Sequence, residues 1–296
     1  MQIPVQLSKV LSIADQSFDL EQTARYRLSI GIAADSISFC LSDPDRNSYT
    51  QLASFENYTY QGVRRLDNEV IEIMIEKVIS LNPWLRGKFA SVNILFEDCR
   101  FTLLPLPLFD LNSYQSIYQY NFNNTIGEDV LYSSLPVSDV VLIYGVPAGL
   151  VESLKKRFPI VLFFHGNFPL LTVFINKYRN EDNKGSVLVN FRNNAMDVLI
   201  INDRKLQLLN SYTCKTDDDV IYFLIFAIEQ MGLNPETVDL LLSGKIERDS
   251  KLHALIKKYV RNIRFINRND DFKYCYAFER IESHQFYNLL NLNLCE

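Results

Sequence analysis

The sequence predicts an α/β protein built from two copies of one unit, with two lobes that each contain a mixed sheet flanked by helices. The same succession of elements occurs at residues 25–98 and 185–244: three alternating apolar runs, an apolar helix and a buried strand. The helix ends in the same tripeptide in both copies, at residues 81–83 and 233–235. An order of elements repeated over about 60 residues predicts a duplicated fold.

The first hairpins of the two copies match position by position. Apolar residues fall on apolar residues: Leu28, Ile30, Ile32, Ile37 and Phe39 on Val187, Val189, Phe191, Met196 and Val198. Period-2 alternation broken by a small or polar pair is typical of a half-buried hairpin. A chain of 296 residues accommodates two domains of ordinary size. We therefore expect a first lobe at residues 1–180 and a second at 181–296, with residues 279–296 packing back on the first.

The first copy begins after residues 1–23, which carry little pattern and are expected to form an extension or an edge strand. Strands are predicted at residues 26–41, as a hairpin turning at 33–36, and at 51–60, 91–96 and 100–108. Asp67 begins a helix whose apolar residues keep helical spacing, and Pro83 ends it. Pro105 and Pro107 place the last strand at an edge, because proline cannot donate to a ladder.

Residues 114–132 are the most irregular part, with tyrosines interleaved among asparagines and glutamines. We predict a helix followed by a loop. The favoured interpretation is an aromatic helix packed on the sheet. The alternative is a partner-binding surface that includes Tyr114 and Tyr118, since tyrosine supplies contact area at low entropic cost.

The remaining elements follow the same logic. Strands are predicted at residues 137–146, 160–164, 186–202 (a hairpin), 205–212, 238–242, 262–266 and 272–278, and helices at 148–158, 168–177, 250–259 and 284–290. Thr216 and the acidic residues 217–219 cap a further helix, for which capping is favoured over cation binding. Residues 220–228 of that helix are apolar all round, which predicts burial on several sides.

Composition excludes several classes of function. A hydrophobic share of 48% with 22% charged residues is typical of a soluble globular protein, and a net charge of -5 gives no general attraction to nucleic acid or anionic lipid. Five scattered cysteines without C-x-x-C spacing indicate free thiols in a reducing compartment, with neither disulfides nor a zinc site. The apolar runs are shorter than the roughly 20 residues that span a bilayer. We expect a cytoplasmic protein without a signal peptide or membrane insertion.

The order of elements resembles the duplicated actin-like ATPase fold, in which two ribonuclease H-like units face each other across a cleft. That resemblance implies a phosphate loop of the form apolar-Asp-x-Gly in each first hairpin, because the turn must present bare N–H groups to phosphate. The expected positions hold Gly31 and Ala33 in the first copy and Asn190 and Arg192 in the second. The adenosine motif survives only in part, ending in Gly244 and Lys245.

Three runs, at residues 100–105, 164–168 and 284–292, resemble an uncharacterised bacterial family of domains of unknown function. The fold of that family is similar to that of the actin-like cytoplasmic proteins of type IV pilus and type II secretion platforms. The resemblance implies no catalytic residues. We therefore expect a non-catalytic actin-like scaffold that binds another protein, with no cofactor, no metal and no ATP.

Two alternatives stay open. One is an actin-like ATPase or kinase with atypical loops. The other is an RNA-associated factor that uses a basic stretch, which consists of Lys251, Lys257, Lys258, Arg261, Arg264 and Arg268. For that stretch a solvated helix face is the favoured interpretation. His165 is a weak candidate for a general base because no nucleophile pattern lies near it, and Asp35 lies in a turn where a nuclease would need a strand. The predicted partner surface comprises Trp84, Tyr114, Tyr118, Lys257, Lys258 and Arg261.

Overall fold

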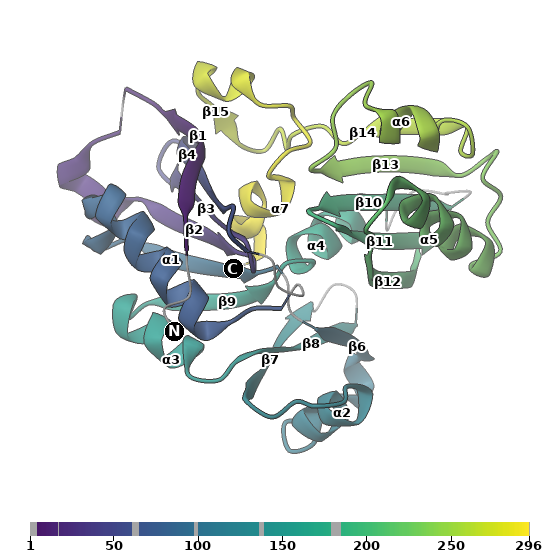
Figure 1. Cartoon of the computed structure of the whole chain (residues 1–296), viewed down its shortest axis with the longest axis horizontal. Helices are drawn as coiled ribbons and strands as arrows, with labels where there is room; N and C mark the ends of the chain where they lie inside the picture. The colour runs from purple at the N-terminus through teal and green to yellow at the C-terminus, as the bar shows by residue number, and fades with distance from the viewer. Residues whose placement is uncertain are drawn as a thin grey trace. The chain divides into compact units, whose positions relative to one another are not determined.

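The computed structural model describes residues 5–16, 18–60, 65–97, 100–135, 139–178 and 185–295. The chain divides into two compact units (Figure 1). The first comprises Met1–Pro169, Asp270–Arg280 and Asn288–Glu296, and the second comprises Leu170–Asn269 and Ile281–Tyr287. The predicted lobe boundary and polar joint fall at residues 179–184, which lie outside the described residues, as do residues 1–4, Cys99 and the start of the strand predicted at 137.

The first unit is organised around one mixed sheet in the order β1-β4-β3-β2-β5-β9. Its strands are β1 (Leu7–Ala14), β2 (Arg27–Ile32), β3 (Ser36–Asp43), β4 (Ser48–Asn57), β5 (Ser91–Phe96) and β9 (Val161–His165), and the short β15 (Lys273–Tyr274) pairs with β4. β2, β3 and β4 are antiparallel neighbours, whereas β5 is parallel to β2 and β9 to β5. β1 occupies the edge that was expected for residues 1–23.

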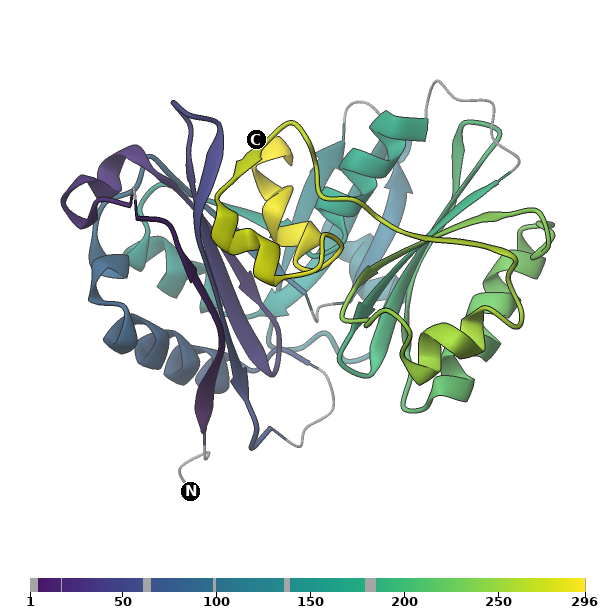
Figure 2. The ribbon, with the colours of Figure 1, turned by 90° about the horizontal axis from the view of Figure 1, so that it is seen from above.

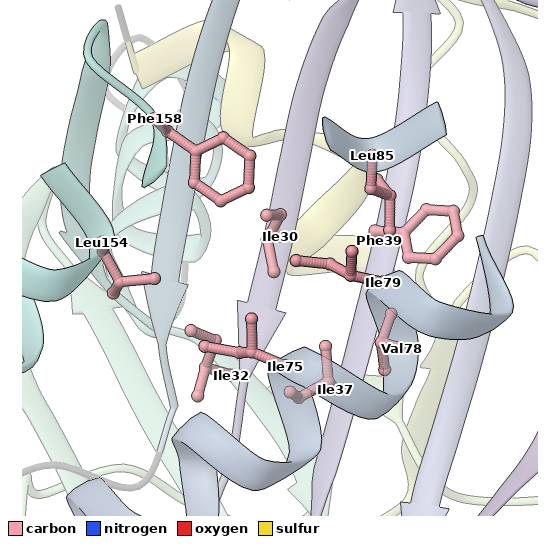
Figure 3. Close-up of a pocket in the computed structure, with 10 residues that line it drawn as sticks. All are labelled: Ile30, Ile32, Ile37, Phe39, Ile75, Val78, Ile79, Leu85, Leu154 and Phe158. Atoms are coloured by element: carbon pink, nitrogen blue, oxygen red, sulfur yellow. The ribbon is translucent and has the colours of Figure 1, made fainter. Parts of the chain in front are cut away.

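The two faces of this sheet are covered by segments distant in sequence (Figure 2). One face carries α1 (Asn68–Leu81) and α3 (Leu150–Arg157), and residues 288–295 lie on the other. The prediction for α1 is confirmed, since Asp67 accepts a hydrogen bond from the Val70 N–H (3.0 Å) and the apolar stripe is buried. A small cavity of about 20 Å³ remains beneath α1 (Figure 3). Its lining is apolar and includes Ile32, Ile75 and Leu154.

An insertion interrupts the crossover from β5 to α3. It contains α2 (Tyr114–Asn121) and a three-stranded sheet of β6 (Phe101–Pro105), β8 (Val140–Pro147) and β7 (Glu128–Leu135), with β8 in the centre. The edge position predicted for the proline-containing strand is confirmed for β6. The predicted loop is wrong from Glu128 onward, because those residues pair with β8 along the whole of β7.

The second unit repeats the strand order of the first in the sheet β12-β11-β10-β13-β14. Its strands are β10 (Ser186–Arg192), β11 (Ala195–Asn202), β12 (Lys205–Thr213), β13 (Asp239–Gly244) and β14 (Asn262–Phe265), and its crossovers contain α5 (Asp217–Gln230) and α6 (Lys251–Ile256). β10 is antiparallel to β11 and parallel to β13, as β2 is to β3 and β5. The predicted duplication of a mixed α/β unit is confirmed.

Helix α5 is capped as predicted, but it is not buried on several sides. Thr216 and Asp219 form a capping box. One face packs into the core, whereas Tyr222 is 63% and Phe226 is 45% exposed. The prediction was wrong because an aromatic residue on the outer face is indistinguishable by hydropathy from one in the core.

The remaining elements are short. α4 (Phe168–Tyr178) and α7 (Tyr287–Leu290) agree with the predicted helices, and 3-10 helices occur at Leu20–Arg25, Pro83–Arg86, Leu106–Leu108, Tyr276–Arg280 and Leu292–Cys295. The strand expected at residues 272–278 is confined to β15. Among the helices of the described ranges, none combines the length and apolarity needed to cross a bilayer.

Candidate functional site

The hairpin of the second unit, where the resemblance implied a phosphate loop, contains a buried ion pair. Asp197 on β11 lies opposite Asn190 on β10 and is 2% exposed. Arg192 binds it in a fork, from Nε to Oδ2 and from Nη2 to Oδ1, both at 2.9 Å. The Asn190 amide donates to Oδ2 at 3.1 Å, and the Ser211 hydroxyl donates to Oδ1. The two polar residues that replaced the phosphate-loop residues are thus bonded to a carboxylate of their own hairpin.

The charges of this cluster stabilise one another. Burial by itself would raise the pKa of Asp197, but the charge of Arg192 and the hydrogen bonds from Arg192, Ser211 and Asn190 outweigh it and hold that pKa below its ordinary value. Asp197 is therefore an anion at neutral pH, placed where a phosphate loop would receive another anion. A second anion bound close to Asp197 would be repelled by it.

Gly244, from the partial adenosine motif, ends β13 beside the same hairpin. Its φ is +81°, and a Cβ there would lie 2.2 Å from the Phe191 carbonyl oxygen and 2.7 Å from Asn190 Oδ1. The backbone geometry thus requires glycine. The Gly244 N–H donates to the His284 carbonyl at 2.9 Å, the Ser243 hydroxyl donates to the same oxygen at 3.2 Å, and the N–H of the exposed Lys245 donates to Phe191. These three donors are therefore already hydrogen-bonded within the chain.

The hairpin of the first unit is closed in a different way. The Ala33 N–H donates to the Ser36 carbonyl at 2.9 Å, which closes a tight turn, and Ala33 and Ala34 are 6% and 1% exposed. A Cβ on Gly31 would lie 3.3 Å from Glu97 Oε1 and 3.7 Å from Leu289. Alanine and glycine here provide close packing rather than an open loop. The Asp35 carbonyl accepts from the Asn57 N–H, which holds the turn against β4.

His165, the candidate general base, is buried at the end of β9. It is 1% exposed, and its Nδ1 accepts the Asn167 N–H at 3.1 Å. Its ring contacts Phe101 and Tyr144, with centroid distances of 4.5 and 5.6 Å. His165 is therefore packed between β9 and the strands β6 and β8 of the insertion.

Two of the predicted partner anchors take part in internal packing. Trp84 is half-buried and packs against Phe18, Phe39 and Phe89, with ring centroids 5.3 to 6.4 Å away, so only part of its ring is accessible to a partner. Tyr118 is fully buried between α2 and the sheet of the insertion, and its hydroxyl donates to Glu128 at 2.9 Å. The favoured interpretation of an aromatic helix packed on the sheet is confirmed for this residue.

Three cations of the basic stretch lie near carboxylates. Lys257 and Arg261 lie 3.9 Å from Asp249 and Glu236, and Arg264 pairs with Asp239. Lys258 is exposed. The carboxylates beside these three cations reduce the net charge that the stretch offers to a nucleic acid.

No group of three or more histidine, cysteine or acidic side chains suited to a metal occurs within the described ranges. The four described cysteines, Cys40, Cys214, Cys275 and Cys295, are free thiols. Sequence reasoning missed Asp197, Ser211 and His284. For Asp197 a signal existed, since a hairpin turning at residues 193–194 places it opposite Asn190. For His284 there was none, because its contact joins residues about 40 positions apart.

The repeated sheet order and the two first hairpins define the class: this is a protein of the actin-like ATPase fold. The chain belongs to the family described as protein of unknown function (DUF3822), whose profile matches residues 15–263. The family resemblance noted in the sequence is thus confirmed.

Solved structures agree with this class. A protein from Bacteroides thetaiotaomicron with an actin-like ATPase fold and unknown function is 25% identical, with a TM-score of 0.76 over 90% of this chain and 99% of that one. The PilM-PilN type IV pilus biogenesis complex contains a chain that is 12% identical, with a TM-score of 0.59 over 90% of this chain and 97% of that one. No curated protein sequence shows significant similarity to this chain.

Proposed function

We propose that this protein is a non-catalytic actin-like scaffold that binds another protein and no longer binds nucleotide. The observation that carries the proposal is the Arg192–Asp197 pair. A phosphate at this hairpin would need the guanidinium or the bare N–H groups, and Arg192 is already committed to a buried carboxylate in a bidentate contact. Removing one partner of a buried pair costs about 3–5 kcal/mol. A phosphate would have to offset that cost while approaching an anion.

Hydrogen bonding elsewhere supports the same proposal. The Gly244 and Ala33 N–H groups donate to chain carbonyls, so a ligand would have to displace bonds already made. Replacing a satisfied hydrogen bond by an equivalent one yields little net free energy. Each closed hairpin thus retains the frame of an actin-like unit without its phosphate-binding chemistry.

Binding to another protein is the activity that such a frame can keep. The structurally similar PilM chain occurs in a complex with PilN. At 12% identity this likeness concerns the fold, and the extension to the present chain is by analogy. We further propose a cytoplasmic location, for which the free thiols of the described cysteines are the support.

Calorimetric titration of the full chain with ATP and Mg²⁺ tests the proposal. We expect no binding heat beyond dilution. A saturable isotherm with one nucleotide per chain would overturn it and favour the actin-like ATPase alternative. The Lys245→Ala variant is the matched control, because Lys245 is exposed beside Gly244 and would contact phosphate under that alternative. Weaker binding by this variant than by the parent would place the nucleotide at the hairpin.

A further inference from the structure

The insertion of the first unit differs from the rest of the chain in charge. Residues 101–147 contain four acidic residues and no lysine or arginine, although the whole chain has 30 basic residues among 296. The second unit makes its equivalent crossover, from β13 to β14, with α6 alone in residues that are all described. The fold therefore does not require the insertion, and its composition points to a separate role.

Apolar side chains are exposed on this acidic insertion. Phe109, Tyr114 and Tyr132 contact one another, with ring centroids 4.8 to 5.9 Å apart, and we call these three residues the aromatic ridge. Within the ridge, Phe109 and Tyr114 are half-buried and Tyr132 is 41% exposed. Leu108 and Leu111, next to the ridge in sequence, are 65% and 63% exposed. Clustered exposed apolar residues of this size mark contact surfaces more often than isolated ones do.

Phe109 and Tyr114 of the ridge pack against the core of the insertion, which includes the buried Tyr118. Glu128 on β7 accepts hydrogen bonds from Arg65 (2.6 Å), Arg100 (2.8 Å) and the buried Tyr118 (2.9 Å). Both arginines lie outside the insertion in sequence, and together they more than neutralise this one carboxylate. The exposed Asp110 adjoins Phe109 in the chain, and the exposed Asp139 precedes β8. A preorganised apolar surface beside carboxylates loses little conformational entropy on binding.

We propose that the aromatic ridge docks a cationic amphipathic segment of a partner protein, with aliphatic side chains on the rings and lysine or arginine beside Asp110 and Asp139. Charge complementarity selects this occupant. On residues 101–147 a nucleic acid or an anionic lipid surface would meet acidic side chains and no lysine or arginine. The inference rests on the proposed function, because it assigns that scaffold its contact surface.

Fluorescence anisotropy with synthetic peptides tests the inference on the full chain. The probe is a labelled amphipathic leucine/lysine peptide of about five helical turns, roughly 18 residues, and its counterpart has glutamate at every lysine position. We expect the lysine peptide to bind and the glutamate peptide not to bind. The Tyr132→Ser and Asp139→Asn variants should each weaken binding, and together by about tenfold or more.

The control variant is Tyr222→Ser, which removes an exposed aromatic residue from α5 and should leave the affinity unchanged. Circular dichroism verifies that every variant is folded. Equal binding of both peptides, no binding, or a loss in Tyr222→Ser equal to that of the ridge variants would overturn the inference. Ridge-dependent self-association or RNA binding would also overturn it. ATP binding in the calorimetric test would refute the loss of nucleotide binding and leave the peptide result standing, so the two failures are distinguishable.

Discussion

Replacing Arg192 by alanine should destabilise the second unit more than any surface ion pair could. The change leaves Asp197 buried, with Asn190 and Ser211 as its remaining side-chain partners. Both members of the pair are largely inaccessible, with side-chain exposures of 13% and 2%. Screening by water is therefore weak, and we expect a loss of about 3–5 kcal/mol. That is a large fraction of the 5–15 kcal/mol that is typical of a domain.

Hydrogen exchange measured by mass spectrometry is the suitable assay, because a chain of two units need not unfold in one step. Peptides covering residues 186–202 should exchange faster in Arg192→Ala, by roughly two to four powers of ten. The control is Arg261→Ala, whose side chain is 75% exposed and whose pair with Glu236 should contribute at most about 1 kcal/mol. The double variant R192M/D197L should regain most of the protection, since it removes both charges.

The pH dependence gives a second readout of the same perturbation. The folded pKa of Asp197 lies below its ordinary value of 3.8, so its contribution to stability is present above that pH and is lost as the pH falls further. In Arg192→Ala we expect burial to outweigh the remaining hydrogen bonds and to raise the pKa of Asp197. Protection should then fall with rising pH through the ordinary carboxyl range. Equal exchange in Arg192→Ala and Arg261→Ala, with the same pH profile, would refute the reasoning.

Three further variants, and one control, test a tight turn, the core and a helix cap. Gly244→Ala should lower the melting temperature because its Cβ would clash with Phe191 at positive φ, whereas Gly127→Ala, with φ +83° and open space, should pay only the backbone strain of about 1–2 kcal/mol. Ile75→Ala enlarges the cavity of Figure 3 and should cost about 2–5 kcal/mol in urea unfolding followed by Trp84 fluorescence. Thr216→Ala removes the α5 cap and should cost about 1 kcal/mol, read as faster exchange in residues 217–222; an unchanged rate would contradict the capping role.

Sequence reasoning succeeded where the determining interactions are local. The i, i+4 spacing in α1 and the alternation in the first hairpins fix which side chains face a core, and residues within one element decide both patterns. The Thr216 cap was predictable for the same reason, since the capping box spans four consecutive residues. These elements were enough to predict the repeated unit.

The failures concern pairings between distant residues. β7 is a strand because it pairs with β8, and the asparagine-rich segment before it gives no sign of that pairing. Tyr118 is buried because the sheet of the insertion lies beneath α2, whereas Tyr222 is exposed because no described element covers that face of α5. The residue type is the same in both cases, so only tertiary context distinguishes them.

The closed hairpins and the acidic insertion both support the proposed function. In the hairpins polar groups are hydrogen-bonded within the chain, whereas in the insertion apolar side chains are exposed. In the second unit Asp197, Arg192 and the Gly244 N–H are satisfied within the chain, although solvated groups would cost less to maintain. In the insertion, Tyr132 of the aromatic ridge and the neighbouring Leu108 and Leu111 remain exposed. A protein under selection for nucleotide binding would leave polar donors open and apolar rings covered. Here the donors are occupied and part of the ridge is exposed, and both features agree with the proposal of a scaffold that binds another protein.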